Sequence, residues 1–280
     1  MSVDDEFDDP TETASLDVGS HLSNGLDSLL SMTGGQLVAL LALFGIVGSL
    51  LVESLVVRIG RDGLEYIREN FDTSEPEVRE AVIEIERALE DMGFGLDIPI
   101  PVALLGLLVL ALLGEAIRIV AVRAFASGEL DGVATELATR RLPIATLYGF
   151  LGGILLSIAV GIGTLLFVVP GLFIFIGTLF FRQEIAIADK GPLQAISGTW
   201  QLTKGNRWTL LLLVIVLWAI GFAVGLVPGV VPGRVGTVLS TVVTSVITVF
   251  SIGVVTDAYV TLRDSPTEDD QPPEADQPTI

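Results

Sequence analysis

Residues 144–188 read IATLYGFLGGILLSIAVGIGTLLFVVPGLFIFIGTLFFRQEIAIA, and the only charged side chains in this run are Arg182 and Glu184. An α-helix needs about 20 apolar residues to cross the roughly 30 Å hydrocarbon layer of a bilayer, so the run is long enough to cross twice. Near its middle, Pro170 lacks a backbone N–H and Gly171 tolerates a positive φ. The stretch therefore predicts two antiparallel membrane helices joined by a tight hairpin turn at Pro170 and Gly171.

The same length criterion finds six apolar blocks in the whole chain. They cover residues 36–57, 98–121, 144–168, 171–188, 208–228 and 235–260. In lipid, every backbone polar group must be satisfied inside the protein, which only helices and closed barrels achieve, and the period-two pattern of barrel strands is missing. We expect an all-α, polytopic integral membrane protein with about six transmembrane helices and short interfacial amphipathic helices. Its first partner is then the lipid bilayer.

Composition and charge exclude two large classes of protein. The 280 residues are 51% hydrophobic with a mean hydropathy of +0.70, whereas soluble domains are roughly 45–50% apolar. A water-soluble enzyme is therefore not expected. The formal net charge is −19, and a nucleic-acid-binding protein needs the opposite sign to displace counterions from phosphates. Nucleic acid is therefore excluded as a partner.

The acidic residues also carry information about the source of the chain. Only two of the 15 cations, Lys190 and Lys204, are lysines. This acidic, lysine-poor composition resembles that of proteins from extreme halophiles, because strong salt screens the repulsion between exposed carboxylates. It predicts a halophilic, archaeal protein. The alternative is that two acidic tails, in an organism of any kind, account for the charge.

The polar ends of the chain set the domain boundaries. Residues 1–17 and 264–280 are rich in Asp and Glu, contain no Lys or Arg and have few apolar side chains, so both are predicted to be disordered acidic tails. The membrane domain is expected at 18–263. No basic segment followed by a small-residue cleavage site precedes Gln36, and we therefore expect the first apolar block to be retained.

Residues 58–97 form the one sizeable polar insertion. Its apolar side chains recur at helical spacing from Leu64 onward, and Ser74 with Glu77 forms a capping box before the second amphipathic run. We expect two short amphipathic helices on the extracytoplasmic side. A sharper hypothesis is that the 74–93 helix binds a protein partner as a coiled coil, but it has fewer than three heptads.

A weak internal repeat predicts where further surface helices lie. Ser28–Gln36 and Gly198–Asn206 both end a short amphipathic stretch with a glycine turn that enters an apolar block, and Leu130–Leu142 has a similar character. Three such units would place three surface helices at one interface. Chance similarity between apolar segments is the alternative.

The distribution of cations predicts the orientation in the membrane. Cytoplasmic loops carry an excess of Lys and Arg close to the ends of the spans. The loops after the second and fourth blocks, on one side, hold Arg123, Arg140, Arg141, Lys190, Lys204 and Arg207. On the other side, the arginines of 58–97 are diluted in a long acidic segment. We expect a multi-pass protein of the cell membrane with both termini in the cytoplasm.

Ionisable residues inside the apolar blocks are the candidates for function. Each costs roughly 2.5–3.5 kcal/mol at mid-helix, so such residues are rare and usually paired. They are Glu53, Glu115, Arg118, Arg182, Glu184 and Asp257. Arg182 lies roughly 16 Å into its span by helical rise, and we expect it to pair with Glu115 or, failing that, with Glu184. A structural pair or a snorkelling side chain is one interpretation, and a substrate-handling site is the other.

Small residues at four-residue spacing let helix backbones approach closely. Gly149 with Gly153 and Gly221 with Gly225 have this spacing. We expect them to pack helices within the chain. Dimerisation is the alternative, and the oligomeric state is left open.

Catalytic signatures are missing. The chain has no cysteine, and His21 is the only histidine. Zinc sites of the usual kind, thiol catalysis and Ser-His-Asp chemistry are excluded together. Neither HExxH nor GxxxxGK[ST] occurs. We therefore expect no enzyme activity, no catalytic residues, no cofactor and no metal.

Residues 186–206 read AIADKGPLQAISGTWQLTKGN. Together with the preceding Pro170-Gly171 and the span containing Arg182, they resemble the motif of the YciC-like (UPF0259) proteins and of the membrane domain attached to some glycerophosphodiester phosphodiesterases. Gly198 stands near where that motif often has serine or arginine, and the 280 residues contain no phosphodiesterase domain. The resemblance implies a six-span membrane domain of a haloarchaeal type, without the enzymatic half.

Two functions remain open. The first is a non-enzymatic membrane scaffold or envelope-homeostasis component, which the missing catalytic groups favour. The second is a small-solute or lipid-handling transporter, which Arg182, Glu115 and the glycine-broken hairpin favour, since interrupted helices often mark sites inside the membrane. A polar cavity within the membrane would separate them, because a scaffold can be dry.

Overall fold

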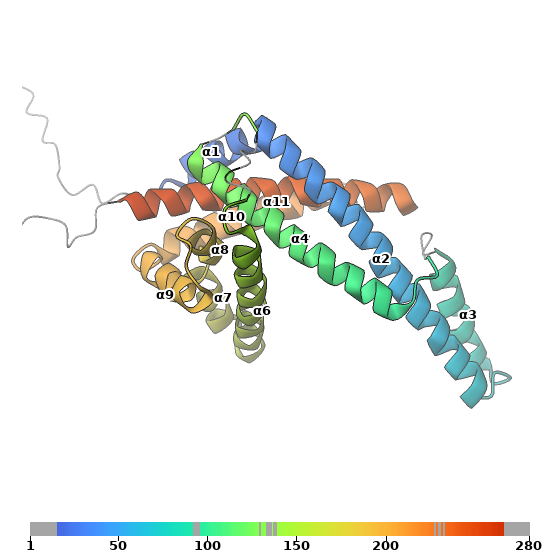
Figure 1. Ribbon diagram of the computed structural model, residues 1–280. Helices are drawn as coiled ribbons and strands as arrows, with labels where there is room; N and C mark the ends of the chain where they lie inside the picture. The colour runs from blue at the N-terminus through green and yellow to red at the C-terminus, as the bar shows by residue number, and fades with distance from the viewer. Residues whose placement is uncertain are drawn as a thin grey trace, which may run out of the picture.

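The computed structural model of the protein describes residues 16–91, 96–128, 130–132, 136, 139–226, 228, 231 and 233–265. All regular structure in these ranges is helical (Figure 1), which confirms the predicted all-α class. Six segments are long and apolar enough to cross a membrane, so the chain is a polytopic membrane protein. Residues 1–15 and 266–280, which make up most of the predicted tails, lie outside the described ranges. The helices are α1 (Val18–Leu30), α2 (Met32–Asn70), α3 (Pro76–Asp91), α4 (Ile100–Ser127), α6 (Leu142–Leu166), α7 (Val168–Gly177), α8 (Phe181–Ala186), α9 (Pro192–Leu202), α10 (Arg207–Gly225) and α11 (Gly233–Asp264).

The longest helix, α2, corrects the prediction for the polar insertion. We expected a span at 36–57 followed by a separate amphipathic helix, but α2 continues without a break to Asn70. The extension contains no proline, and Gly60 and Gly63 weaken a helix without ending it. With 39 residues, α2 is roughly 58 Å long, nearly twice the hydrocarbon thickness. Its C-terminal part therefore projects beyond the bilayer, and the insertion has one separate helix in its described residues.

That separate helix, α3, folds back along the extension of α2 (Figure 1). It begins at Pro76, one residue later than a capping box at Ser74 predicts. The Ser74 N–H donates to the Asp72 carboxylate at 2.9 Å, which lowers the pKa of that carboxyl. Leu89 packs over Gly60, where a Cβ would lie 2.6 Å from Leu89 Cδ2. In this way α2 covers part of the apolar stripe of the 74–93 helix, which was considered as a binding site for a protein partner.

The helices α6 and α7 form an antiparallel hairpin, but its turn is not at the predicted residues. The chain reverses at Phe167, and Pro170 and Gly171 lie inside the first turn of α7. A proline is tolerated there, whereas in a continuous helix it would clash with the carbonyl of Leu166. The reversal therefore precedes the proline. Gly163 of α6 and Gly171 of α7 let the two helices approach, since a Cβ at Gly163 would lie only 3.0 Å from the Cα of Gly171.

The fourth membrane segment is broken inside the bundle. Its first helix, α7, ends at Gly177, and α8 begins at Phe181. A break frees backbone donors that must find partners within the protein. The Phe180 N–H donates to the hydroxyl of Thr199 in α9 at 3.2 Å. The short helix α9 therefore stabilises the break.

The amphipathic helix α1 packs on the last membrane helix. Asp17 caps it, because the Asp17 carboxylate accepts from the N–H groups of Gly19 at 3.0 Å and Ser20 at 3.2 Å. Gly25 then lies against Gly253 of α11, where a Cβ would come within 3.3 Å of the Gly25 Cα. Like α9 before α10, α1 precedes a long membrane helix. The third unit of the proposed repeat falls partly outside the described residues.

Two regions differ strongly in packing. We define the packed end as α1, α8, α9, residues 115–127 of α4 and residues 245–264 of α11. We define the long arm as residues 43–70 of α2, all of α3 and residues 100–114 of α4, which extend away from α6, α7, α8, α9 and α10 in Figure 1. Within α4, Ala121, Val122, Arg123 and Ala124 are buried, whereas Ala103 is the one buried residue of 100–114.

Candidate functional site

Three charged side chains meet between α4 and α8. Arg182 Nε donates to Glu115 Oε1 at 2.8 Å, and Arg118 Nη1 lies 3.7 Å from Glu115 Oε2. The Glu115 side chain is only 4% exposed, whereas those of Arg118 and Arg182 are 39% and 43% exposed. One carboxylate thus serves two guanidinium groups. We call Glu115, Arg118 and Arg182 the charged trio, and it carries one net positive charge.

Two glycines of α6 make room for the charged trio. A Cβ at Gly149 would lie 2.6 Å from Glu115 Oε1, so a larger residue there would push the carboxylate away. A Cβ at Gly153 would meet nothing closer than Arg182 Nη2 at 4.0 Å. The sequence proposed these glycines for helix packing. In the structure, Gly149 seats the carboxylate and Gly153 faces open space beside the arginine.

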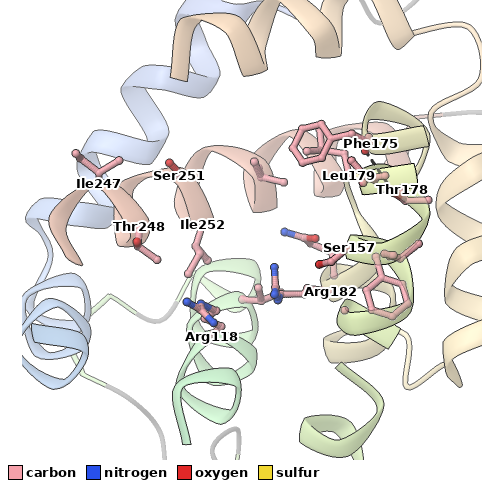
Figure 2. A pocket seen from close by; sticks show the side chains of 18 residues that line it. Arg118, Ser157, Phe175, Thr178, Leu179, Arg182, Ile247, Thr248, Ser251 and Ile252 are labelled. Atoms are coloured by element: carbon pink, nitrogen blue, oxygen red, sulfur yellow. Dashed lines mark hydrogen bonds between the residues drawn. The ribbon is translucent and has the colours of Figure 1, made fainter. Parts of the chain in front are cut away.

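That open space is a cavity of about 680 Å³. Figure 2 shows Arg118 and Arg182 near one another on one side of it, with Thr248, Ser251 and Ile252 of α11 across from them. Its volume falls within the roughly 300–1,000 Å³ typical of small-molecule sites. The two arginines are the only ionisable residues among those that line it. The cavity is therefore positive on one wall and largely apolar elsewhere.

Gln183 adds a neutral polar group to the same cavity. It is a buried residue whose Nε2 lies 3.5 Å from the Thr256 hydroxyl, and its Oε1 has no hydrogen-bond partner among the described residues. A buried amide oxygen without a donor is costly and calls for an explanation. Gln183 is not among the predicted site residues, because an uncharged amide does not stand out as an ion in an apolar segment does. The available signal was a polar side chain beside Arg182 in an apolar segment.

Glu184, the second partner considered for Arg182, binds elsewhere. Lys190 Nζ lies 2.5 Å from Glu184 Oε2, and a Cβ at Gly198 would lie 2.7 Å from both atoms. Residues two apart on a helix do not face each other, so Arg182 and Glu184 point to different neighbours. The Lys190 pair fixes α8 against α9 and leaves Arg182 to Glu115.

Gly221 and Gly225 do not create a close helix contact, in contrast to the prediction. A Cβ at Gly221 would lie at an ordinary 3.5 Å from Ile247, and one at Gly225 would meet nothing within 4 Å. Gly152 has the tight contact instead, because a Cβ there would lie 2.2 Å from the Phe181 ring. The spacing of glycines did not identify which of them face a neighbouring helix.

The single histidine joins α1 to the last membrane helix, a contact that the sequence does not predict. His21 Nδ1 lies 2.6 Å from Asp257 Oδ2, and the Asn24 amide donates to the same carboxylate at 3.2 Å. Asp257 is one of the ionisable residues that the sequence places inside the apolar blocks. The structure gives it a partner on α1, so this contact joins α1 to α11.

Arg123 holds the broken segment in place. Its Nε donates to the Ala186 carbonyl at 2.9 Å, and its Nη1 donates to the Arg140 carbonyl at 2.6 Å. Its Nη2 lies 3.9 Å from the carboxylate of Asp189, which Arg140 also contacts. These bonds connect α4 to the end of α8. They therefore fix the short helix that carries Arg182.

Comparison with known proteins identifies a family but no activity. No curated protein and no solved structure matches the chain. The resemblance to YciC-like proteins, drawn from residues 186–206, therefore stays a prediction. A family model described as "Domain of unknown function (DUF7847)" matches residues 16–262. The match begins just before α1 and ends within the last turn of α11, so it covers the whole helical bundle, and the chain belongs to this DUF7847 family.

Proposed function

We propose that the protein is a small-solute or lipid-handling transporter. Its ligand carries an anionic group, which binds in the cavity beside the charged trio. Of the two functions that the sequence leaves open, this is the second. The observation that carries it is the excess positive charge on the wall of a 680 Å³ cavity inside membrane-spanning segments.

The charge imbalance is the physical reason. A guanidinium cannot lose its proton at any ordinary pH, so each arginine in the membrane needs an anion, carbonyl groups or water. Glu115 Oε1 is taken up by Arg182, and Arg118 has only the longer 3.7 Å contact to the other oxygen. A purely structural pair would need one arginine. The second guanidinium supports a role in binding an anion.

The proposed role is binding and not catalysis. Neither arginine is a nucleophile or a general base, and Glu115 is held in two ionic contacts. No cofactor, metal or catalytic residue enters the proposal.

The test is to fill the cavity. Gly153→Leu adds a side chain where a Cβ meets nothing closer than 4.0 Å, so we expect it to fold and to occupy the cavity. Gly114→Leu is the matched control, because its Cβ also meets nothing within 4 Å and Gly114 does not line the cavity. After gentle solubilisation, mass spectrometry of extracted molecules should find an anionic ligand with wild type and Gly114→Leu and lose it with Gly153→Leu. Equal ligand content in all three folded proteins would overturn the proposal.

We also propose that the packed end faces the cytoplasm, with both termini in the cytoplasm of a cell-membrane protein. The cations near the span ends, Arg123, Arg140, Lys190 and Arg207, support this orientation by the positive-inside rule. Single cysteines at Ser74 and Ser265 of this cysteine-free chain test it. An impermeant maleimide applied to intact cells should label the first and not the second, and the reverse pattern would refute the orientation.

A halophilic, archaeal source is part of the proposal as well. It is supported by the net charge of −19 and the two lysines. Exposed carboxylates repel one another less in strong salt. The thermal midpoint in detergent should therefore rise from 0.15 M to 3 M KCl, and a flat or falling midpoint would count against it.

The scaffold function retains one observation in its favour. The long arm extends α2 past the bilayer and carries α3, which is rich in exposed Glu and Arg residues. Deleting residues 71–91 separates the two functions. Loss of a cross-linked protein partner with unchanged ligand content would support a scaffold role of the long arm beside ligand binding.

A further inference from the structure

We propose that the ligand is an anionic amphiphile, whose single negative charge lies at Arg118 and Arg182 and whose chain runs along α11 toward Trp218. This inference rests on the proposed function and specifies its ligand. It is carried by a second cavity and by the charge of the first.

The second cavity, of about 420 Å³, adjoins the first. It lies between α7, α10 and α11, and apolar residues such as Val214, Leu217 and Trp218 form its own walls. The residues that line both cavities are Phe175, Leu179, Ile247, Thr248, Ser251 and Val255. The two spaces therefore lie side by side along α11, and together we call them the groove. From Val255 to Thr244 it follows α11 for roughly 16 Å.

The groove has the polarity of an amphiphile. Its arginines lie in the first cavity only, and no ionisable residue lines the second. Trp218 packs against Phe175 with ring centroids 5.9 Å apart, and Trp218 is otherwise largely exposed. A hydrocarbon chain can therefore lie against these rings while its headgroup lies at the arginines.

The charge of the trio selects the headgroup. One net positive charge is neutralised by one negative charge, as in a phosphodiester or a carboxylate. A zwitterionic headgroup would bring its own cation beside two arginines, where like charges repel. The planar guanidinium of arginine binds two oxygens of a phosphate or carboxylate through paired N–H donors.

Brominated lipids test the proposal through Trp218. The full chain is reconstituted into phosphatidylcholine vesicles that contain equal small fractions of acyl-brominated phosphatidylglycerol or acyl-brominated phosphatidylcholine. The difference in fluorescence between wild type and Trp218→Phe isolates the signal of Trp218. We expect at least threefold stronger quenching of this signal by the anionic lipid. The preference should vanish in Arg118→Gln, which leaves the 2.8 Å bond between Arg182 and Glu115 intact.

Lys204→Gln is the matched control. It removes one cation from an exposed position in the turn before α10, outside the groove, and should retain the preference. Equal quenching by the two lipids in wild type would overturn the inference, because Trp218 would then report only ordinary bilayer lipid. The wild-type comparison decides even if Arg118→Gln does not fold.

A second measurement separates this inference from the proposed function. Inorganic phosphate is added to the detergent-solubilised protein, and the thermal midpoint is followed. If phosphate raises the midpoint in an Arg118-dependent manner while the lipids show no preference, the anion site stands and the amphiphile is wrong. If neither phosphate nor lipid shows an Arg118-dependent effect, both proposals are wrong.

Discussion

The packed end and the long arm share one helix, α4, yet only the half of α4 at the packed end has a continuous run of buried residues. The helix α4 passes through both. Its residues 100–114 read IPVALLGLLVLALLG, and residues 115–127 read EAIRIVAVRAFAS. Both halves are apolar, but leucine dominates the first and alanine and valine dominate the second. The buried run at Ala121–Ala124 lies in the half with small side chains.

This difference reflects how helices associate in a membrane. Lipid tails are as apolar as leucine, so leucines alone do not drive helices together, whereas small residues allow close contact and polar groups add hydrogen bonds. Ala121 of α4 and Val249 of α11, both at the packed end, form one cluster with Leu37 of the neighbouring α2. The bonds of Arg123 and of the charged trio lie in the same region. Stability should therefore depend on the packed end far more than on the long arm.

The largest expected effect is at Arg123. Arg123→Met keeps the length of the side chain and removes the donors to the Ala186 and Arg140 carbonyls, which are 2.9 and 2.6 Å away. Leaving both carbonyls without a donor should cost about 3 kcal/mol, visible as a lower thermal midpoint in detergent. Arg140→Gln removes a half-exposed partner of Asp189 and should cost less than about 1 kcal/mol. Equal losses for the two variants would contradict this expectation, because the buried bonds of Arg123 would then contribute no more stability than the half-exposed pair of Arg140.

The next effect concerns the charged trio. Glu115→Leu leaves two guanidinium groups side by side, and we expect a loss of about 2 kcal/mol, limited by their partial exposure. Arg182→Leu should cost less, because Arg118 can still approach Glu115. The double variant should cost less than the sum of the two single ones. If the decrease in thermal midpoint of the double variant equalled the sum of the two single decreases, Arg182 and Glu115 would not stabilise each other.

The outcome for the fold shows how far sequence reasoning reaches. Six membrane segments followed from the length of the apolar blocks alone, because the hydrocarbon thickness sets that length. The ends of the helices did not follow, since α2 keeps its helical period into the polar region. The turn of the α6–α7 hairpin was placed three residues late, at Pro170, because proline is as compatible with the first turn of a helix as with the turn before it.

Only the charged residues of the candidate site could be predicted from the sequence. Glu115 and Arg182 were selected because the cost of an ion in lipid leaves few alternatives. The remaining features depend on how α4, α6 and α11 cross, and the spacing of residues along one helix does not determine this crossing. These features are the contact of Gly149 with Glu115, the cavity, and Gln183 in its wall. The break at residues 178–180 likewise depends on Thr199, a residue from another helix.

The break at residues 178–180 directly precedes α8 of the packed end, and one hydroxyl group should stabilise it. Thr199→Val keeps the shape of the buried side chain and removes the acceptor 3.2 Å from the Phe180 N–H. An unpaired buried N–H should cost about 1–2 kcal/mol. Thr199→Ser keeps the hydroxyl and is expected to cost less. Hydrogen exchange at Phe180 should accelerate in the valine variant and remain slow in the serine variant. The same exchange rate in both variants would show that the Thr199 hydroxyl does not stabilise the break.

The smallest effect is expected in the long arm. Arg68 of α2 donates to Glu86 of α3, and both side chains are about half exposed. Such surface pairs contribute roughly 0.2–1 kcal/mol and are screened by salt, because the Debye length falls from about 10 Å at 0.1 M to about 3 Å at 1 M. Arg68→Gln should therefore speed hydrogen exchange of α3 slightly at 0.1 M and leave it unchanged at 1 M. Leu89→Ala, which removes the apolar contact over Gly60, should speed it at both concentrations. If the effect of Arg68→Gln were as large at 1 M as at 0.1 M, the ion pair would have to be shielded from solvent, and the long arm would resemble the packed end more than its exposure indicates.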